Sequence, residues 1–137
     1  MSTQNEYLLL FRGDESWKSV SPEELQKVMD QVKGWFARLT ELGKLKAAQP
    51  LAREGAMVSG KNGRVVADGP FAESKEAIGG YVLLEADSLD EAIAIAKSCP
   101  TLEFGTQVEV RPVAEECPMT AHARQILPEA ELATAAA

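Results

Sequence analysis

The sequence is poor in the residues that mark metal-binding, disulfide-linked or nucleic-acid-binding proteins. Its 137 residues include one histidine and two cysteines, and 14 Lys and Arg stand against 21 Asp and Glu, a formal net charge of −7. No run of Lys and Arg occurs, so we expect neither a nucleic-acid nor a membrane partner. Cys99 and Cys117 do not make a disulfide framework, and no cluster has metal-ligand spacing, so we predict no metal.

The signatures of cofactor chemistry and of export are also missing. There is no GxGxxG or GxxxxGK[ST] loop and no Gly-x-Ser-x-Gly turn, so we predict no cofactor. The first six residues are polar, and no apolar run approaches the roughly 20 residues that span a bilayer. With 45% hydrophobic residues the chain can bury a core. These features predict a cytoplasmic protein with one domain.

The most distinctive stretch reads Asp-Gly-Pro-Phe-Ala-Glu-Ser-Lys-Glu-Ala-Ile-Gly-Gly-Tyr, from Asp68 to Tyr81. Its first three residues have the chemistry of a tight turn, because Asp can bond its own backbone, Gly allows positive φ and Pro fixes φ. The glycine pair at 79 and 80 allows a close backbone approach or a bulge before a strand. The stretch is either a solvated crossover loop or a pocket wall that carries Asp68, Glu73 and Lys75.

Hydrophobic periodicity predicts four strands, two helices and a hairpin. The strands are expected at 6–12, 44–51, 78–86 and 106–113, and the hairpin at 57–67 around Asn62-Gly63. One helix begins after Ser21, which forms a capping box with Glu24, and ends near residue 43. The other begins after Ser88 and ends at Cys99-Pro100. The apolar face of the first helix comprises Leu25, Val28, Met29, Val32, Phe36, Leu39 and Leu42, with Trp35 beside it.

This order of elements predicts an α+β fold, a ferredoxin-like βαββαβ antiparallel sheet with an added hairpin and two helices on one face. Residues 7–11 are apolar on both faces of their strand, so the second sheet face also needs cover. Two sheets packed face to face in a homodimer would provide it. In the last strand, Glu109 and Arg111 lie on a polar face that is either solvated or lines a cavity. We expect a domain at 1–114 and a tail at 115–137, either disordered or an arm on a partner.

The stretch that begins at Asp68 resembles the DGPF branch of the YCII-related domain family. The resemblance rests on Asp-Gly-Pro-Phe with the following Ala-Glu-Ser-Lys-Glu and Gly-Gly-Tyr, and covers about residues 6–113. It implies a ferredoxin-like fold that pairs as a dimeric α/β barrel, but little about activity, because most members are uncharacterised. DGPF proteins are often linked with extracytoplasmic-function sigma factors, so the resemblance also implies a possible partner of that class.

The acid–base dyad that the resemblance would imply lacks its histidine. The name-giving YCII branch carries a His near the first helix, paired with an Asp, whereas here that helix begins Ser-Pro-Glu-Glu-Leu-Gln-Lys-Val and the only histidine is His122 in the tail. Acid–base catalysis would then require a carboxylate tuned by burial, with Asp68, Glu24 and Asp14 as candidates.

Two functions remain open at this point. One is a binding or accessory module with an apolar cleft for a small organic ligand, which the absence of a core histidine favours. The other is a cofactor-independent lyase or isomerase, which would need a buried carboxylate, with Asp68 as the predicted catalytic residue. We expect Asp68, Arg12 and Trp35 to share one cleft. The predicted ligand-binding residues are Arg12, Asp14, Trp35, Phe71, Glu73, Lys75 and Tyr81.

Overall fold

The computed structural model describes residues 5–69 and 76–128. The elements in these ranges are β1 (Glu6–Arg12), η2 (Ser16–Ser19), α1 (Pro22–Glu41), β2 (Leu45–Pro50), β3 (Ala56–Ser59), η3 (Lys61–Gly63), β4 (Val65–Asp68), β5 (Ile78–Glu85), α2 (Leu89–Lys97), η4 (Pro100–Phe104), β6 (Gln107–Pro112) and α3 (Pro118–Ile126). The η elements are short 3-10 helices. All predicted strands and helices are present within a few residues of their expected bounds.

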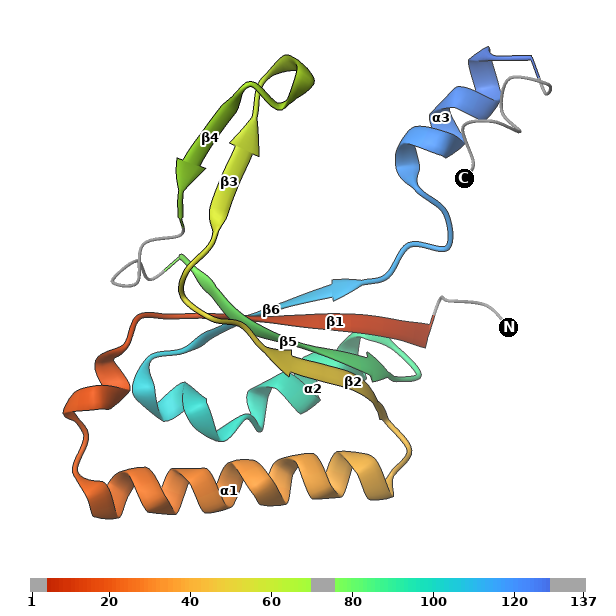
Figure 1. Ribbon diagram of the computed structural model, residues 1–137. Helices are drawn as coiled ribbons and strands as arrows, with labels where there is room; N and C mark the ends of the chain where they lie inside the picture. The colour runs from red at the N-terminus through yellow and green to blue at the C-terminus, as the bar shows by residue number, and fades with distance from the viewer. Residues whose placement is uncertain (1–4, 70–75, 129–137) are drawn as a thin grey trace.

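Four strands form an antiparallel sheet in the order β2-β5-β1-β6. Both long helices, α1 and α2, lie on the same face of this sheet (Figure 1). The β3/β4 hairpin is inserted between β2 and β5 and forms a separate two-stranded sheet. This is the predicted α+β, ferredoxin-like βαββαβ fold with an added hairpin.

Side-chain caps start both long helices as predicted. The Ser21 hydroxyl accepts a hydrogen bond from Glu24 N at 3.2 Å, and the Ser88 hydroxyl accepts one from Glu91 N at 3.1 Å. The Glu91 carboxylate accepts a hydrogen bond from Asp87 N, one residue before the cap, rather than from Ser88 N. Each cap satisfies a backbone donor that the first helical turn leaves without a partner, and such caps contribute about 1 kcal/mol.

The core lies between the sheet and the two helices. Leu9 of β1 and Leu84 of β5 are fully buried there, and Trp35 and Leu39 of α1 cover them at 4% exposure each. Burial of one such leucine stabilises the fold by roughly 1.5–3 kcal/mol. The Trp35 indole also donates a hydrogen bond to the Ser98 hydroxyl at 2.8 Å, which ties α1 to the end of α2.

The apolar face predicted for α1 was partly wrong. Met29 and Leu42 were expected to be buried but are 46% and 61% exposed, whereas Trp35, placed beside the face, is buried. Compared with the predicted face, the helix is turned about its axis, so that Val28, Trp35 and Leu39 pack against the sheet. Helical periodicity reveals an apolar arc, but the neighbouring elements decide which part of the arc is covered.

The opposite sheet face has an apolar centre. Leu8 and Leu10 of β1 stand directly opposite Leu83 and Tyr81 of β5, and residues opposed in an antiparallel pair share a face. The buried residues Leu9 and Val82 alternate with them, so these four side chains point away from the helices. All four are partly exposed. We call them the open-face strip.

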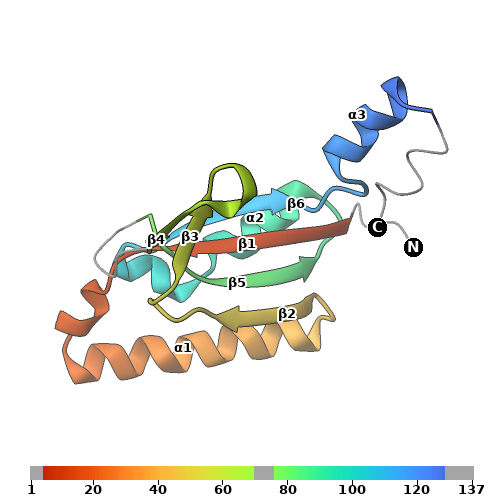
Figure 2. The same cartoon turned by 45° about the horizontal axis from the view of Figure 1, so that its top comes forward.

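The hairpin and α3 project from the side of the sheet that carries the open-face strip (Figures 1 and 2). The hairpin turn has the predicted positive φ values, 63° at Asn62 and 66° at Gly63. All eight residues of β3 and β4 are exposed, and α3 has no buried residue. Residues 118–126 of the tail form α3, and its lack of a buried face explains why no periodic pattern predicted this helix.

Candidate functional site

The main polar cluster of the open face lies at the end of β1. The Arg12 guanidinium donates from Nε and Nη2 to Glu109 Oε1, at 3.2 and 2.9 Å, across the β1–β6 pair. The side chains of Arg12 and Glu109 are 30% and 38% exposed, so a bound molecule could reach them. Leu10 stands directly opposite Glu109 in the register, which places this ion pair beside the open-face strip.

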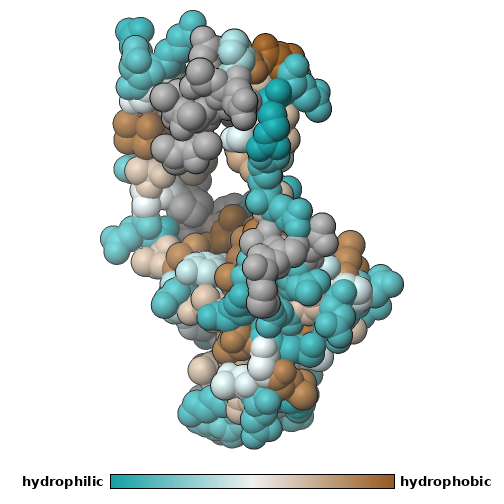
Figure 3. Space-filling view, turned by 90° about the vertical axis from the view of Figure 1, so that its right-hand side faces the viewer, coloured by the Kyte–Doolittle hydropathy of each residue, from teal (hydrophilic) through white to brown (hydrophobic). Residues whose placement is uncertain are grey.

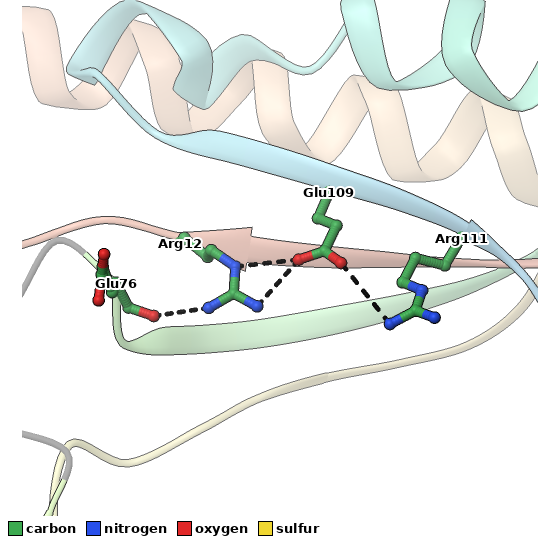
Figure 4. Close-up of polar contacts among 4 residues, drawn as sticks. All are labelled: Arg12, Glu76, Glu109 and Arg111. Atoms are coloured by element: carbon green, nitrogen blue, oxygen red, sulfur yellow. Dashed lines mark hydrogen bonds and ion pairs between the residues drawn. The ribbon is translucent and has the colours of Figure 1, made fainter.

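Two further groups extend the cluster (Figure 4). Arg12 Nη1 donates to the backbone carbonyl of Glu76 at 2.7 Å, which fixes the segment just before β5 to the end of β1. Arg111 Nη1 lies 3.9 Å from Glu109 Oε2. Glu109 is therefore placed between two guanidinium groups.

Arg53 reaches the same end of the sheet from the connection between β2 and β3. Its Nη2 donates to the carbonyl of Gly13, the residue after Arg12, at 2.8 Å. Its Nη1 is buried and has no hydrogen-bond acceptor within the described residues. The backbone bond from Leu51 N to Gly79 O, 2.9 Å, holds this connection beside the start of β5.

The structure brings together some of the residues predicted to bind a ligand and separates others. Arg12 and Tyr81 both lie on the open face. Asp14 lies two residues beyond Arg12, and its Oδ1 accepts a hydrogen bond from Ser16 N in the η2 turn. Phe71, Glu73 and Lys75 lie outside the described residues.

The prediction that Asp68, Arg12 and Trp35 share one cleft is wrong for Trp35. Trp35 packs edge-on against Phe11, with ring centroids 6.4 Å apart, on the helix side of the sheet. Arg12 follows Phe11 and points to the other side, since alternate strand residues face opposite ways. Asp68 ends β4 as an exposed residue, paired with Ala56.

Arg53, Glu109 and Arg111 were absent from the predicted ligand-binding set. The alternation of β6 placed Glu109 and Arg111 on a polar face but could not show that Arg12 would lie across from them. No local signal marks Arg53, which acquires its role only because the connection after β2 crosses to Gly13.

No carboxylate residue is buried within the described residues, and no charged residue there is buried as a whole, although the Nη1 atom of Arg53 is. The same residues contain no group of three or more His, Cys, Asp or Glu side chains able to hold a metal ion. Of the other proposed carboxylates, Glu24 is exposed and lines a cavity of about 350 Å³ between α1, η2 and η4. That cavity lies on the helix side, away from the open-face strip.

Among the described helices, none is both long and apolar enough to span a bilayer. The model of the YCII-related domain matches residues 6–121. An uncharacterised protein of Rhizobium meliloti (strain 1021) is 35% identical over 113 residues, covering 79% of this chain and 91% of the relative.

Among solved structures, 5-chloro-2-hydroxyhydroquinone dehydrochlorinase from Burkholderia phenoliruptrix AC1100, in complex with 2,5-dihydroxybenzoquinone, is 22% identical. The match covers 79% of this chain and 93% of the dehydrochlorinase, with a TM-score of 0.41. The family match spans most of the chain, and the R. meliloti relative aligns over most of its own length. The chain therefore belongs to the YCII-related domain family.

Proposed function

We propose that this protein is a homodimeric binding module that holds a small organic molecule on the open face of its sheet. The observation that carries the proposal is a sheet face with an apolar centre and an arginine cluster at one end, uncovered by the helices of its own chain. Apolar surface beside a few convergent polar groups is typical of small-molecule sites.

Three parts of the molecule support a dimer, because other parts of the same chain do not bury their apolar side chains. The open-face strip is partly exposed, both faces of the hairpin carry exposed valines, and α3 has no buried residue. Isolated two-stranded hairpins and nine-residue helices are marginal in water, so each gains from a surface to pack on. Figure 3 shows the molecule hollowed beside the sheet, with hydrophobic side chains at its surface there. A second copy placed in this hollow would cover all three.

Charge is compatible with pairing of two copies. Several ionic groups of the open face are paired within the chain: Arg12 and Arg111 with Glu109, and Lys46 with Glu6 at 2.8 Å. These ion pairs reduce the like-charge repulsion between two such faces, although the chain as a whole carries −7.

The alternative function, a cofactor-independent lyase or isomerase, lacks a supporting observation at the carboxylates that the structure describes. Asp68, the predicted catalytic residue, is exposed in β4. Membership of the DGPF branch, a sigma-factor partner and a cytoplasmic location stay predictions.

The proposal is tested by a thermal-shift screen of small aromatic acids, lactones and ring-cleavage products. A molecule that binds the folded state raises its melting temperature by mass action. We expect at least one hit that is weakened by Tyr81→Ala and unchanged by Met29→Ala, a matched exposed position on the helix side. If both variants reduced the ligand-dependent shift in melting temperature equally, or if no compound raised the melting temperature, binding at the open face would be contradicted.

A further inference from the structure

We propose that the ligand of the open face carries a carboxylate, and that Arg53, together with Arg12, binds it at the end of β1. This inference rests on the proposed function and adds the chemical class of the ligand. It starts from the buried Nη1 of Arg53, which has no acceptor among the described residues.

A buried guanidinium nitrogen without a partner is costly. Arg carries five N–H donors and no acceptor, and an unsatisfied buried donor loses its hydration without compensation. The bond from Nη2 to Gly13 O at 2.8 Å fixes the Arg53 guanidinium beside the end of β1, where its Nη1 is buried. An oxyanion at this position would complete the hydrogen bonding of Nη1.

Three separate segments converge at this corner of the sheet. Arg12 ends β1 and binds the carbonyl of Glu76, just before β5. Arg53 comes from the connection after β2 and binds the residue that follows Arg12. The corner is therefore held by backbone contacts from β1, β5 and the β2–β3 connection, and its arginines are positioned before any ligand arrives.

The charges at the corner favour an anion. Arg12 and Arg53 bring two guanidinium groups to the corner, and Glu109 ion-pairs with Arg12 there and with Arg111 farther along the sheet, opposite Leu8. Of the other acidic residues nearby, Asp14 binds Ser16 N, and the side chain of Glu76 points away from Arg12 (Figure 4).

The neighbouring side chains select a carboxylate with a small apolar body. Arginine pairs with carboxylates through charge-assisted bonds that are about twice as strong as neutral ones. Leu10 lies on the same face two residues before Arg12, and Tyr81 stands opposite Leu10. A ring held against these two side chains would place its carboxylate toward the arginines.

The test compares benzoate with benzamide by isothermal titration of the full chain. The two probes share the ring and differ in the charged group, so wild-type protein alone decides whether charge is recognised. We expect benzoate to bind at least tenfold more tightly than benzamide. Equal binding of the two, or tighter binding of inorganic phosphate than of benzoate, would overturn the inference while leaving open-face binding intact.

The matched variants are Arg53→Gln and Arg38→Gln, the second an exposed arginine of α1 on the helix side. Arg53→Gln should weaken benzoate binding at least tenfold, and Arg38→Gln should leave the affinity for benzoate unchanged. Arg53→Lys keeps the charge and serves as the folded comparison if Arg53→Gln unfolds. Benzoate affinity that is equal in wild type, Arg53→Gln and Arg53→Lys would contradict the role of Arg53. If neither neutral nor anionic compounds bind, the proposed function itself fails.

Discussion

At the scale of single residues, the two tryptophans have contrasting positions. Trp35 is 4% exposed and bonded to Ser98, whereas Trp17 is 42% exposed in η2 with the Lys18 amine 5.7 Å from its ring centre. Trp35 therefore acts in the core, and Trp17 lies at the surface.

Replacement of the two tryptophans should separate these roles. Trp35→Ala leaves a core cavity and should lower the free energy of unfolding by about 3–5 kcal/mol. Trp17→Ala should change it by about 0.5 kcal/mol or less, as is usual for surface positions. Urea denaturation measures both. A similar loss in the two variants would contradict the placement of Trp35 in the core.

The two cysteines also differ in environment. Cys99 is buried at 6% exposure, and Cys117 is exposed immediately before α3. The backbone N–H groups of Thr120 and Met119 lower the pKa of the Cys117 thiol from its ordinary 9.0 by bonding to its charged form.

Alkylation should therefore discriminate between the cysteines. We expect iodoacetamide to label Cys117 faster than Cys99, with a rate that rises through a midpoint below pH 9.0. Mass spectrometry of peptides after timed quenching measures both rates. The thiolate is the reactive form, so a midpoint at or above the ordinary value would show that the α3 turn is absent in solution.

At the scale of elements, the ends of α1 and α2 could be predicted from the sequence because capping is local. Ser21 and Ser88 bond to backbone donors three residues later, and this spacing is visible in the chain. The strands could also be predicted, because the alternation of apolar and polar residues and the short apolar runs are local patterns in the sequence.

Other features could not be predicted because they depend on contacts between distant segments. The rotation of α1 that exposes Leu42 is set by the sheet and α2. Arg53 lies 40 residues from Gly13, and Arg12 lies 97 residues from Glu109, so no local pattern links them. The separation of Trp35 from Arg12 follows from strand alternation, but only once the sheet and helix α1 are packed together.

The ion pair between Lys44 and Glu91 joins the start of β2 to α2. Its atoms lie 2.8 Å apart, with side chains 24% and 33% exposed. The bond to Glu91 raises the pKa of Lys44 above 10.5, and the bond to Lys44 lowers the pKa of Glu91 below 4.5. The pair is partly exposed, so we expect it to contribute about 0.2–1 kcal/mol.

This pair predicts a pH dependence with two limits. The ion pair should stabilise the fold fully between pH 4.5 and pH 10.5, the pKa values of Glu and Lys in the unfolded chain. This stabilisation should be lost as the pH falls through the lowered pKa of Glu91, and also as the pH rises through the raised pKa of Lys44. The measurement is the difference in free energy of unfolding between wild type and Lys44→Met, with Lys33→Met as the exposed control. A Lys44→Met difference that is constant from pH 3 to pH 12 would contradict the pair.

The hairpin is the element whose role depends most on a partner. Val58 and Val66 stand opposite each other and are 64% and 65% exposed. The double variant Val58→Lys and Val66→Lys should raise the dimer dissociation constant at least tenfold without destabilising the monomer. Leu42→Lys, at an equally exposed position on the helix side, should leave the dimer unchanged. Analytical ultracentrifugation measures both, and equal effects would show that the hairpin does not contact a second copy.

At the scale of the whole molecule, the two faces of the sheet differ in how they are covered. The helices protect one side of the sheet, while the open-face strip, hairpin and α3 leave apolar groups exposed on the other. Burial of apolar surface between two copies would stabilise all three at roughly 25 cal/mol for each Å² removed from water.

The most direct test is the molar mass of the purified chain, measured by size-exclusion chromatography with light scattering. We expect twice the 14.8 kDa of one chain for wild type and for Met29→Glu on the helix side. Leu83→Glu, which places a charge in the open-face strip, should yield a folded species of 14.8 kDa. A wild-type protein that remains a monomer at tens of micromolar, or a Leu83→Glu variant that remains a dimer, would contradict pairing through the sheet.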